Sequence, residues 1–207
     1  MTVTEIKPYK GDTMCVEFAE TSENLYIHRS IAVKYMISKG MSLSDSDLKE
    51  IRHAQTFRTA RERGLYLLDE RDYSFKGLFE KLSRNYEDGI CLEVCNDLAA
   101  QGRINDRKYA AALAEYYSCV KNYGYFRAKQ EILKKGISSA AAEDSLAPYN
   151  DSAAERLEKL IDDKYLRRIR SRKDLDKVFA ALARLGYSYS LIREVFALYD
   201  FELDEEY

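Results

Sequence analysis

The chain has 207 residues, of which 46% are hydrophobic, so it can bury the core of one or two domains and is not a disordered segment. Its 33 lysines and arginines nearly balance 35 aspartates and glutamates. The resulting net charge of −2 excludes a general attraction to nucleic acid or to membrane surfaces and leaves only local basic patches for that purpose. Nine glycines and two prolines are few for this length, and because both residues interrupt helices, their scarcity favours a mainly helical fold.

No segment has the pattern of a secretion signal or a membrane helix. The N-terminus lacks the apolar core of a signal peptide, and no apolar run approaches the roughly 20 residues that span a bilayer. We therefore expect a cytoplasmic protein with no membrane partner, in which the four cysteines stay reduced.

The N-terminal segment differs from the rest because short stretches alternate polar and apolar residues there. This pattern predicts a meander of short strands that must pack on helices to be stable. A helix is expected to begin near Ser30 and to end at Gly40, where glycine favours a helix terminus. Ser44 and Asp47 have the spacing of a capping box at the start of the next helix. The expected strands cover residues 2–8, 14–19 and 24–28.

A helix-ending turn recurs through the remainder at intervals of 51 and 50 residues. At each turn, Asn or Gly is expected to adopt the left-handed conformation that ends one helix, and Asp or Ser caps the next. A longer helix is expected before each pair, near residues 51–69, 105–121 and 152–168. The ending residues are Asn85, Gly136 and Gly186, the apolar residues that follow them are Tyr86, Ile137 and Tyr187, and the capping residues are Asp88, Ser138 and Ser188.

This period predicts a mainly α fold of three tandem three-helix modules, in an elongated and curved repeat body, preceded by a small N-terminal β/α extension. The extension covers residues 1–48, and the modules cover residues 49–101, 102–148 and 149–207, the last with an acidic tail. Such a body presents an extended concave surface, which suits a long partner better than a small substrate.

The sequence gives little support to a catalytic or metal-binding function. No phosphate loop, no Gly-x-Ser-x-Gly elbow and no His-centred nucleophile pair is present, so we expect no enzyme activity and no cofactor. Cys91 and Cys95 lie one helical turn apart and supply only two of the four ligands of a structural zinc site. We expect no metal site, and we interpret these cysteines as buried thiols that pack as small hydrophobic side chains.

Several segments in order resemble the RecX family. Residues 102–113, GRINDRKYAAAL, are similar to its Gly-aromatic-Leu-Asp-Asp-x-Arg-Phe-Ala signature, and residues 122–137, NYGYFRAKQEILKKGI, to its Gly-x-x-Arg-Ile-x-x-Glu-Leu-x-x-Lys-Gly-Ile stretch. Residues 164–196 resemble its C-terminal module, and residues 25–48 the extension of its longer members. The resemblance covers nearly the whole chain. Departures that we interpret as variants of packing and capping occur at Asn85, Arg103, Ile104, Asn105, Lys108, Tyr109 and Ala128.

The resemblance implies a regulator that binds RecA filaments on single-stranded DNA and does no covalent chemistry. It implies that the chain modulates, and mostly inhibits, RecA ATPase, strand exchange and SOS co-protease activity, with weak direct DNA contact as a further implication. Whether it caps filament ends or coats the groove is left open, as is assistance of RecA in some settings. We expect a monomer. The alternatives are a helical-repeat DNA-binding protein that acts without RecA and a scaffold for another protein.

Basic side chains are the candidates for contact with the partner. Arg127 and Lys134, seven residues apart, share a helix face, and the run at residues 167–173 lies at a helix end, where cations also favour the helix dipole. Guanidinium groups suit bidentate contact with phosphate or carboxylate of a partner. The alternative is that these cations only form a solvated helix face. The candidates are Arg103, Arg107, Lys121, Arg127, Lys129, Lys134, Lys135, Arg167, Arg168, Arg170, Arg172 and Lys173.

An aromatic cluster accompanies these cations in the second module. Aromatic rings between basic residues can stack on nucleic-acid bases, but at helical spacing we expect them to belong to the core. Asp106 is expected to have a structural role in the first turn of its helix. The cluster consists of Tyr116, Tyr117, Tyr123, Tyr125 and Phe126.

Overall fold

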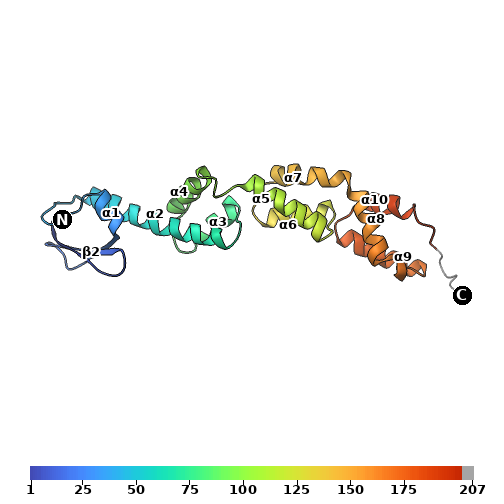
Figure 1. Cartoon of the computed structure of the whole chain (residues 1–207), viewed down its shortest axis with the longest axis horizontal. Coiled ribbons are helices and arrows are strands. Elements are labelled where there is room, and N and C mark those ends of the chain that lie inside the picture. Colours follow the sequence, from blue (N-terminus) through green and yellow to red (C-terminus); the bar gives the residue numbers. More distant parts are fainter. Residues whose placement is uncertain (202–207) are drawn as a thin grey trace. The chain divides into compact units, whose positions relative to one another are not determined.

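The computed structural model describes residues 1–201 and is mainly helical, with a small sheet at the N-terminus (Figure 1). This confirms the predicted mainly α fold and its N-terminal strands. The tandem arrangement of three-helix modules, their boundaries and the elongated shape stay predictions. The strands are β1 Val3–Pro8, β2 Thr13–Phe18 and β3 Leu25–His28, and the helices are α1 Arg29–Lys34, α2 Asp45–Glu70, α3 Phe75–Leu82, α4 Asp88–Ala100, α5 Asp106–Glu115, α6 Tyr125–Lys134, α7 Ser139–Asp151, α8 Ala153–Lys164, α9 Arg172–Arg184 and α10 Tyr189–Phe196.

Two short segments continue helices with other geometry. A π-helical segment, Tyr116–Val120, extends α5, and a 3-10 turn, Leu166–Arg168, follows α8. No helix within residues 1–201 combines the length and the apolar character needed to cross a membrane. The predicted acidic tail falls mostly on residues 202–207, which lie outside the described part of the chain.

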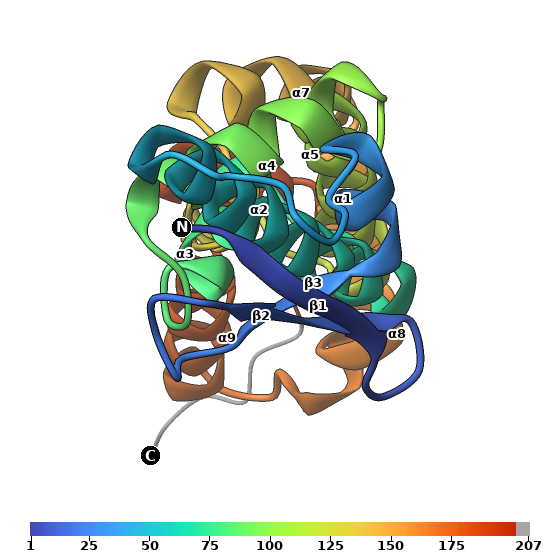
Figure 2. The same cartoon turned by 90° about the vertical axis from the view of Figure 1, so that its left-hand side faces the viewer.

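The chain forms two compact units, which we describe separately. The first contains residues 1–71 and 78–103, and the second contains residues 72–77 and those from 104 onward. In the first unit, β1, β2 and β3 form an antiparallel sheet in sequence order, and Figure 2 shows the three strands side by side. Val16 and Ile27 of this sheet pack with Ile31, Leu48 and Ile51 in one hydrophobic core, so the sheet is stabilised by helices as expected.

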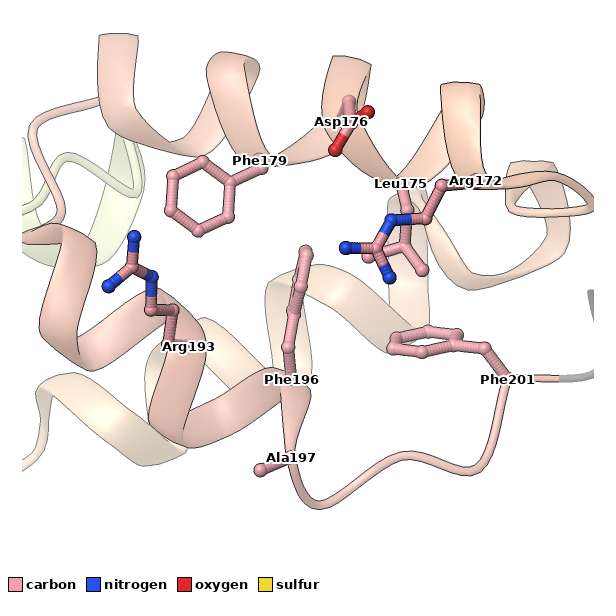
Figure 3. A pocket seen from close by; sticks show the side chains of 8 residues that line it. All are labelled: Arg172, Leu175, Asp176, Phe179, Arg193, Phe196, Ala197 and Phe201. Atoms are coloured by element: carbon pink, nitrogen blue, oxygen red, sulfur yellow. The ribbon is translucent and has the colours of Figure 1, made fainter.

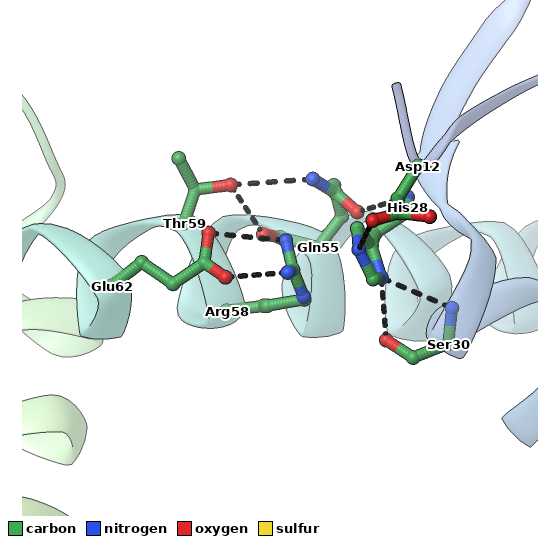
Figure 4. Close-up of polar contacts among 7 residues, drawn as sticks. All are labelled: Asp12, His28, Ser30, Gln55, Arg58, Thr59 and Glu62. Atoms are coloured by element: carbon green, nitrogen blue, oxygen red, sulfur yellow. Dashed lines mark hydrogen bonds and ion pairs between the residues drawn. The ribbon is translucent and has the colours of Figure 1, made fainter. Parts of the chain in front are cut away.

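Polar contacts also join this sheet to α2. The backbone amide of His28 donates a 2.8 Å hydrogen bond to Gln55 Oε1, and His28 Nδ1 accepts one from the amide of Ser30 at the start of α1 (Figure 4). His28 Nε2 lies 3.9 Å from Asp12 Oδ2. A single histidine thus connects the β1–β2 turn, the end of β3 and the long helix.

The prediction that the first helix ends at Gly40 is wrong, because α1 ends at Lys34. Met36 adopts a left-handed conformation with φ of 50°, and the amide of Ile37 donates to the carbonyl of Ala32 at 2.9 Å. This early turn brings Ile37 into the core. Gly40, with φ of 84°, instead lies beside β1 and donates to the carbonyl of Val3 at 2.8 Å.

The capping box at the start of α2 is confirmed. The Asp47 amide donates to Ser44 Oγ at 3.1 Å, and the Ser44 amide donates to Asp47 Oδ2 at 2.8 Å. Near the other end of α2, Gly64 lies against Leu98 of α4, and Arg61 Nε donates to Asp97 Oδ2 at 2.6 Å. α2 therefore contacts both the sheet and α4.

The second unit has a core in each of its helical groups. Leu113, Ile132 and Leu146 belong to the core of α5, α6 and α7. Leu182 and Ile192 belong to the core of α8, α9 and α10. All these side chains are buried.

The expected turn geometry is confirmed at two of its three positions. Gly136 and Gly186 have φ of 84° and 92°, and Ser138 and Ser188 each accept a hydrogen bond from an amide three residues later. The expectation of a left-handed conformation is wrong for Asn85. Its amide donates to the Leu82 carbonyl at 2.9 Å in a tight turn, and among the described residues only Met36 and Asn122 are non-glycine residues with positive φ.

The expected cap at Asp88 is also wrong. Glu87 holds the N-cap position of α4 without a side-chain bond, and Asp88 lies in the first turn. At this position the positive end of the helix dipole still stabilises the Asp88 carboxylate.

The starts of two helices lie against the ends of others within the second unit. The amide of Gly124, before α6, donates to the carbonyl of Leu185 at 2.8 Å, and the amide of Phe126 donates to that of Gly186 at 3.2 Å. Ser74, which directly precedes α3, lies 50 residues before Gly124 in the sequence. Its Oγ donates a 2.5 Å hydrogen bond to the carbonyl of Lys135, at the end of α6. Both contacts satisfy polar backbone groups that helix termini leave unpaired.

We predict that Gly124→Ala destabilises the second unit. A Cβ at this position would lie 2.4 Å from backbone atoms of Gly186 and Tyr187, which cannot move aside as a flexible side chain would. The free energy of unfolding, measured by urea denaturation, should fall by about 1–3 kcal/mol, the usual range for overpacking. Gly89→Ala is the control, because a Cβ there meets nothing within 4 Å and should leave stability equal or higher. Equal effects of both substitutions would contradict the close backbone contact.

A second prediction concerns the capping box. Bonds from the Ser44 hydroxyl and amide hold the pKa of Asp47 below its ordinary value, so this box stabilises the fold above the ordinary aspartate pKa and loses that effect as pH falls through the lowered pKa. Ser44→Ala should lower the urea midpoint at neutral pH. The difference from the wild type should shrink as the solution is acidified below pH ~4. A difference that is constant with pH would show that the Asp47 carboxylate takes no part.

Candidate partner-binding surface

The candidate basic side chains are not equivalent. Arg103 belongs to the first unit, where its Nη2 donates to Asp69 Oδ1 at 2.7 Å and links the turn after α4 to the end of α2. All the other candidates belong to the second unit. Arg103 is therefore already paired within its own unit.

Arg127 is part of the junction between α6 and α9. Its guanidinium carbon lies 4.1 Å from the centre of the Tyr123 ring, and Nη1 donates to the carbonyl of Arg184 at 3.2 Å. A cation at this position interacts favourably with the carbonyl end of α9. Arg127 is half-buried, so its removal would weaken the junction as well as any external contact.

Three lysines of the same helical group have internal partners. Lys129 Nζ lies 2.6 Å from Glu143 Oε1, which joins α6 to α7, raises the pKa of Lys129 and lowers the pKa of Glu143. Lys134 pairs with Glu131 at 2.8 Å on its own helix. Lys121 Nζ lies 5.3 Å from the centre of the Tyr116 ring, and its hydrogen bond to the Tyr116 hydroxyl raises the lysine pKa. Lys129 and Lys134 therefore offer less unbalanced charge to a partner, whereas Lys121 has no carboxylate partner within residues 1–201.

The remaining candidates are exposed and have no ion pair within residues 1–201. The densest group surrounds Ile169, which is 7% exposed and packs in the core of α8, α9 and α10. Its burial holds the neighbouring arginines at the surface. These unpaired candidates are Arg107, Lys135, Arg167, Arg168, Arg170, Arg172 and Lys173.

The position of this run corrects the expectation about the helix dipole. Arg172 and Lys173 are the first two residues of α9, where the dipole disfavours positive charge. Asp174 in the same turn bonds with Lys177 and Ser171, and both contacts lower its pKa. The dipole therefore does not account for Arg172 and Lys173 at this position.

The aromatic cluster divides into core and surface. Tyr117 is buried and stacks on Tyr123 with ring centres 5.8 Å apart, as the core interpretation predicts. Tyr116 and Phe126 are 40% and 56% exposed, so the core interpretation is wrong for them. Asp106 has its expected structural role, because its Oδ1 accepts a 2.8 Å hydrogen bond from the amide of Phe75 at the start of α3.

Cys91 and Cys95 are consistent with inert packing, whereas Cys119 is exposed. Cys91 and Cys95 are buried, and burial raises the pKa of Cys95 to about 11, so its thiol stays protonated at neutral pH. Among residues 1–201, no group of three or more His, Cys, Asp or Glu side chains is arranged to hold a metal ion.

Sequence reasoning missed a groove between α9 and α10. Arg193 lies beside Phe179 and Phe196 there, together with the predicted Arg172 (Figure 3). The spacing of Arg193 and Phe196, three residues apart on an amphipathic helix, was a usable indication. The packing of α10 on α9, which sequence alone does not give, creates the groove.

Several proteins similar to this chain are named regulatory protein RecX. No family model matches it. A regulatory protein RecX from Streptococcus gordonii is 31% identical over 193 residues, which cover 90% of this chain and 73% of that protein, and one from Streptococcus pneumoniae is 29% identical over 194 residues with the same coverage.

Solved structures support the fold. A crystal structure of a regulatory protein RecX superposes with a TM-score of 0.75 at 21% identity, covering 95% of this chain and 98% of that one. The structure of RecX from Lactobacillus salivarius gives a TM-score of 0.62 at 24% identity, covering 70% and 97%. Together with the sequence identities over most of both chains, this likeness establishes that the chain belongs to the regulatory protein RecX family.

Proposed function

We propose that this chain binds RecA filaments assembled on single-stranded DNA and restrains their ATPase, strand exchange and SOS co-protease activities. Membership of the RecX family carries the proposal. The chain would act by binding alone, in the cytoplasm and as a monomer. A protein that binds one state of a filament more tightly shifts the assembly equilibrium without covalent chemistry.

The unpaired basic run is the contact that we propose. The net charge of the chain is −2, so attraction to a filament must come from a local group of cations. The arginines around the buried Ile169 form such a group, with no carboxylate partner within residues 1–201. Arg107 and Lys135 are secondary contacts in the same unit. The paired cations Arg103, Lys129 and Lys134 contribute less.

The test is RecA ATP hydrolysis on single-stranded DNA, titrated with the wild type and with an Arg168→Glu/Arg170→Glu variant. The wild type should suppress hydrolysis at levels well below those of RecA. The variant should require at least about tenfold more protein, because two charge reversals replace attraction with repulsion. Lys49→Glu/Arg52→Glu on α2 is the matched control, with the same charge change on exposed side chains of the first unit, and should act like the wild type.

The possible outcomes distinguish the proposed function from the proposed contact surface. If the wild type leaves hydrolysis and strand exchange unchanged at equimolar amounts, the proposed function is wrong. If the wild type inhibits and the variant does so equally well, the function stands but the basic run is not the contact. Equal weakening of variant and control would indicate that only the net charge matters.

A second candidate function is DNA binding without RecA, which the exposed guanidinium groups of the run favour. Affinity for a fluorescein-labelled oligothymidylate, measured from 50 to 200 mM salt, distinguishes the two. Binding of this single strand by the five basic side chains of the run should weaken by roughly two orders of magnitude over this range. We expect weak binding to DNA alone, and a tight and steeply salt-dependent affinity would favour this second function.

A further inference from the structure

A groove between α9 and α10 has the features of a peptide-binding site. It consists of two hollows of about 470 and 540 Å³ that share Phe179 and Arg193. We propose that this groove binds a short acidic segment of a partner protein that inserts an apolar side chain between two or more arginines. This inference does not depend on the assignment of RecA as the partner.

The floor of the groove is a preformed set of aromatic rings. Phe179 and Phe196 meet edge to face with ring centres 6.0 Å apart, and Phe196 meets Phe201 in the same way at 5.6 Å (Figure 3). Phe179 also stacks on Tyr189, which is 64% exposed. Because the rings hold one another in place, an apolar side chain can bind without ordering them first.

The rim of the groove is mainly positive. Arg172 at the start of α9, Arg184 at its end and Arg193 on α10 are all exposed, and within residues 1–201 their guanidinium groups have no carboxylate partner. One carboxylate, that of Asp176, also lines the groove. A guanidinium group binds a carboxylate through two parallel hydrogen bonds, so the rim fits acidic residues on either side of an apolar anchor.

The arrangement favours an acidic peptide over single-stranded nucleic acid. Bases bind to exposed ring faces, whereas Phe179 stacks on Tyr189 and meets Phe196 edge to face. Asp176 would also repel a continuous phosphate backbone. A peptide needs only two or three carboxylates at discrete positions, together with an apolar residue that fills the hollow between them.

The test measures fluorescence anisotropy of a labelled hexapeptide, Asp-Glu-Phe-Leu-Glu-Asp, with the full chain. The wild type should bind it saturably, and Arg193→Glu should weaken binding by at least roughly tenfold, because a charged hydrogen bond is lost and repulsion is added. Arg52→Glu is the matched control, since Arg52 is exposed on α2 in the first unit and lines neither hollow. Its affinity should change less than about twofold.

A second probe tests the apolar anchor. A peptide with serine in place of Phe and Leu should bind at least about tenfold more weakly, because it fills no hollow. Equal binding of both peptides, equal losses in both arginine variants, or the absence of saturable binding would each overturn the proposal. So would displacement of the peptide by a lower concentration of oligothymidylate, which would assign the groove to nucleic acid.

The acidic segment of the chain itself is the remaining candidate occupant. Residues 202–207 include Glu202, Asp204, Glu205 and Glu206. If a chain ending at Phe201 binds the probe tenfold or more tightly than the full chain, the chain's own segment covers the groove and the proposal of a partner segment is wrong. Equal affinities support the partner. None of these results affects the RecA ATPase test, so the two proposals can fail separately.

Discussion

The second unit depends on a backbone contact in which the start of α6 lies against the turn that ends α9. Amides of Gly124 and Phe126 donate to carbonyls of Leu185 and Gly186, so each helix end satisfies polar groups of the other. Such an approach requires glycine, because a Cβ at Gly124 or Gly186 would lie about 2.4 Å from backbone atoms of the facing segment. The same contact brings Arg127 to the carbonyl of Arg184 and thereby fixes a candidate binding residue in a structural role.

The basic side chains of this protein fall into two groups, according to whether a carboxylate of the same chain already pairs with them. Arg103, Lys129 and Lys134 have carboxylate partners, and their attraction to an external anion is largely compensated. The cations around Ile169 have none within residues 1–201, and two of them stand where the dipole of α9 disfavours them. In a protein whose net charge is −2, this local unbalanced positive charge is the basis of the filament contact that we propose.

Local chemistry made much of the fold predictable from the sequence. The glycines at 136 and 186, the serine caps after them and the capping box at Ser44 follow from rules that act within a few residues. Predictions failed where a distant contact decides the conformation. α1 ends before Gly40 because Ile37 enters a core formed with the sheet. Arg127 is half-buried because α9 ends beside it. Pairing of cations depends on neighbours in space, so sequence proposed twelve equal candidates that the structure separates.

Hydrogen–deuterium exchange of this chain, with and without RecA filaments on single-stranded DNA, tests the central claim most directly. The account predicts slower exchange on filament binding in the backbone around residues 166–173 and at the start of α9, with little change in the sheet of the first unit. Protection confined to the first unit, or none at saturating filament, would contradict the claim that the unpaired basic run contacts the partner.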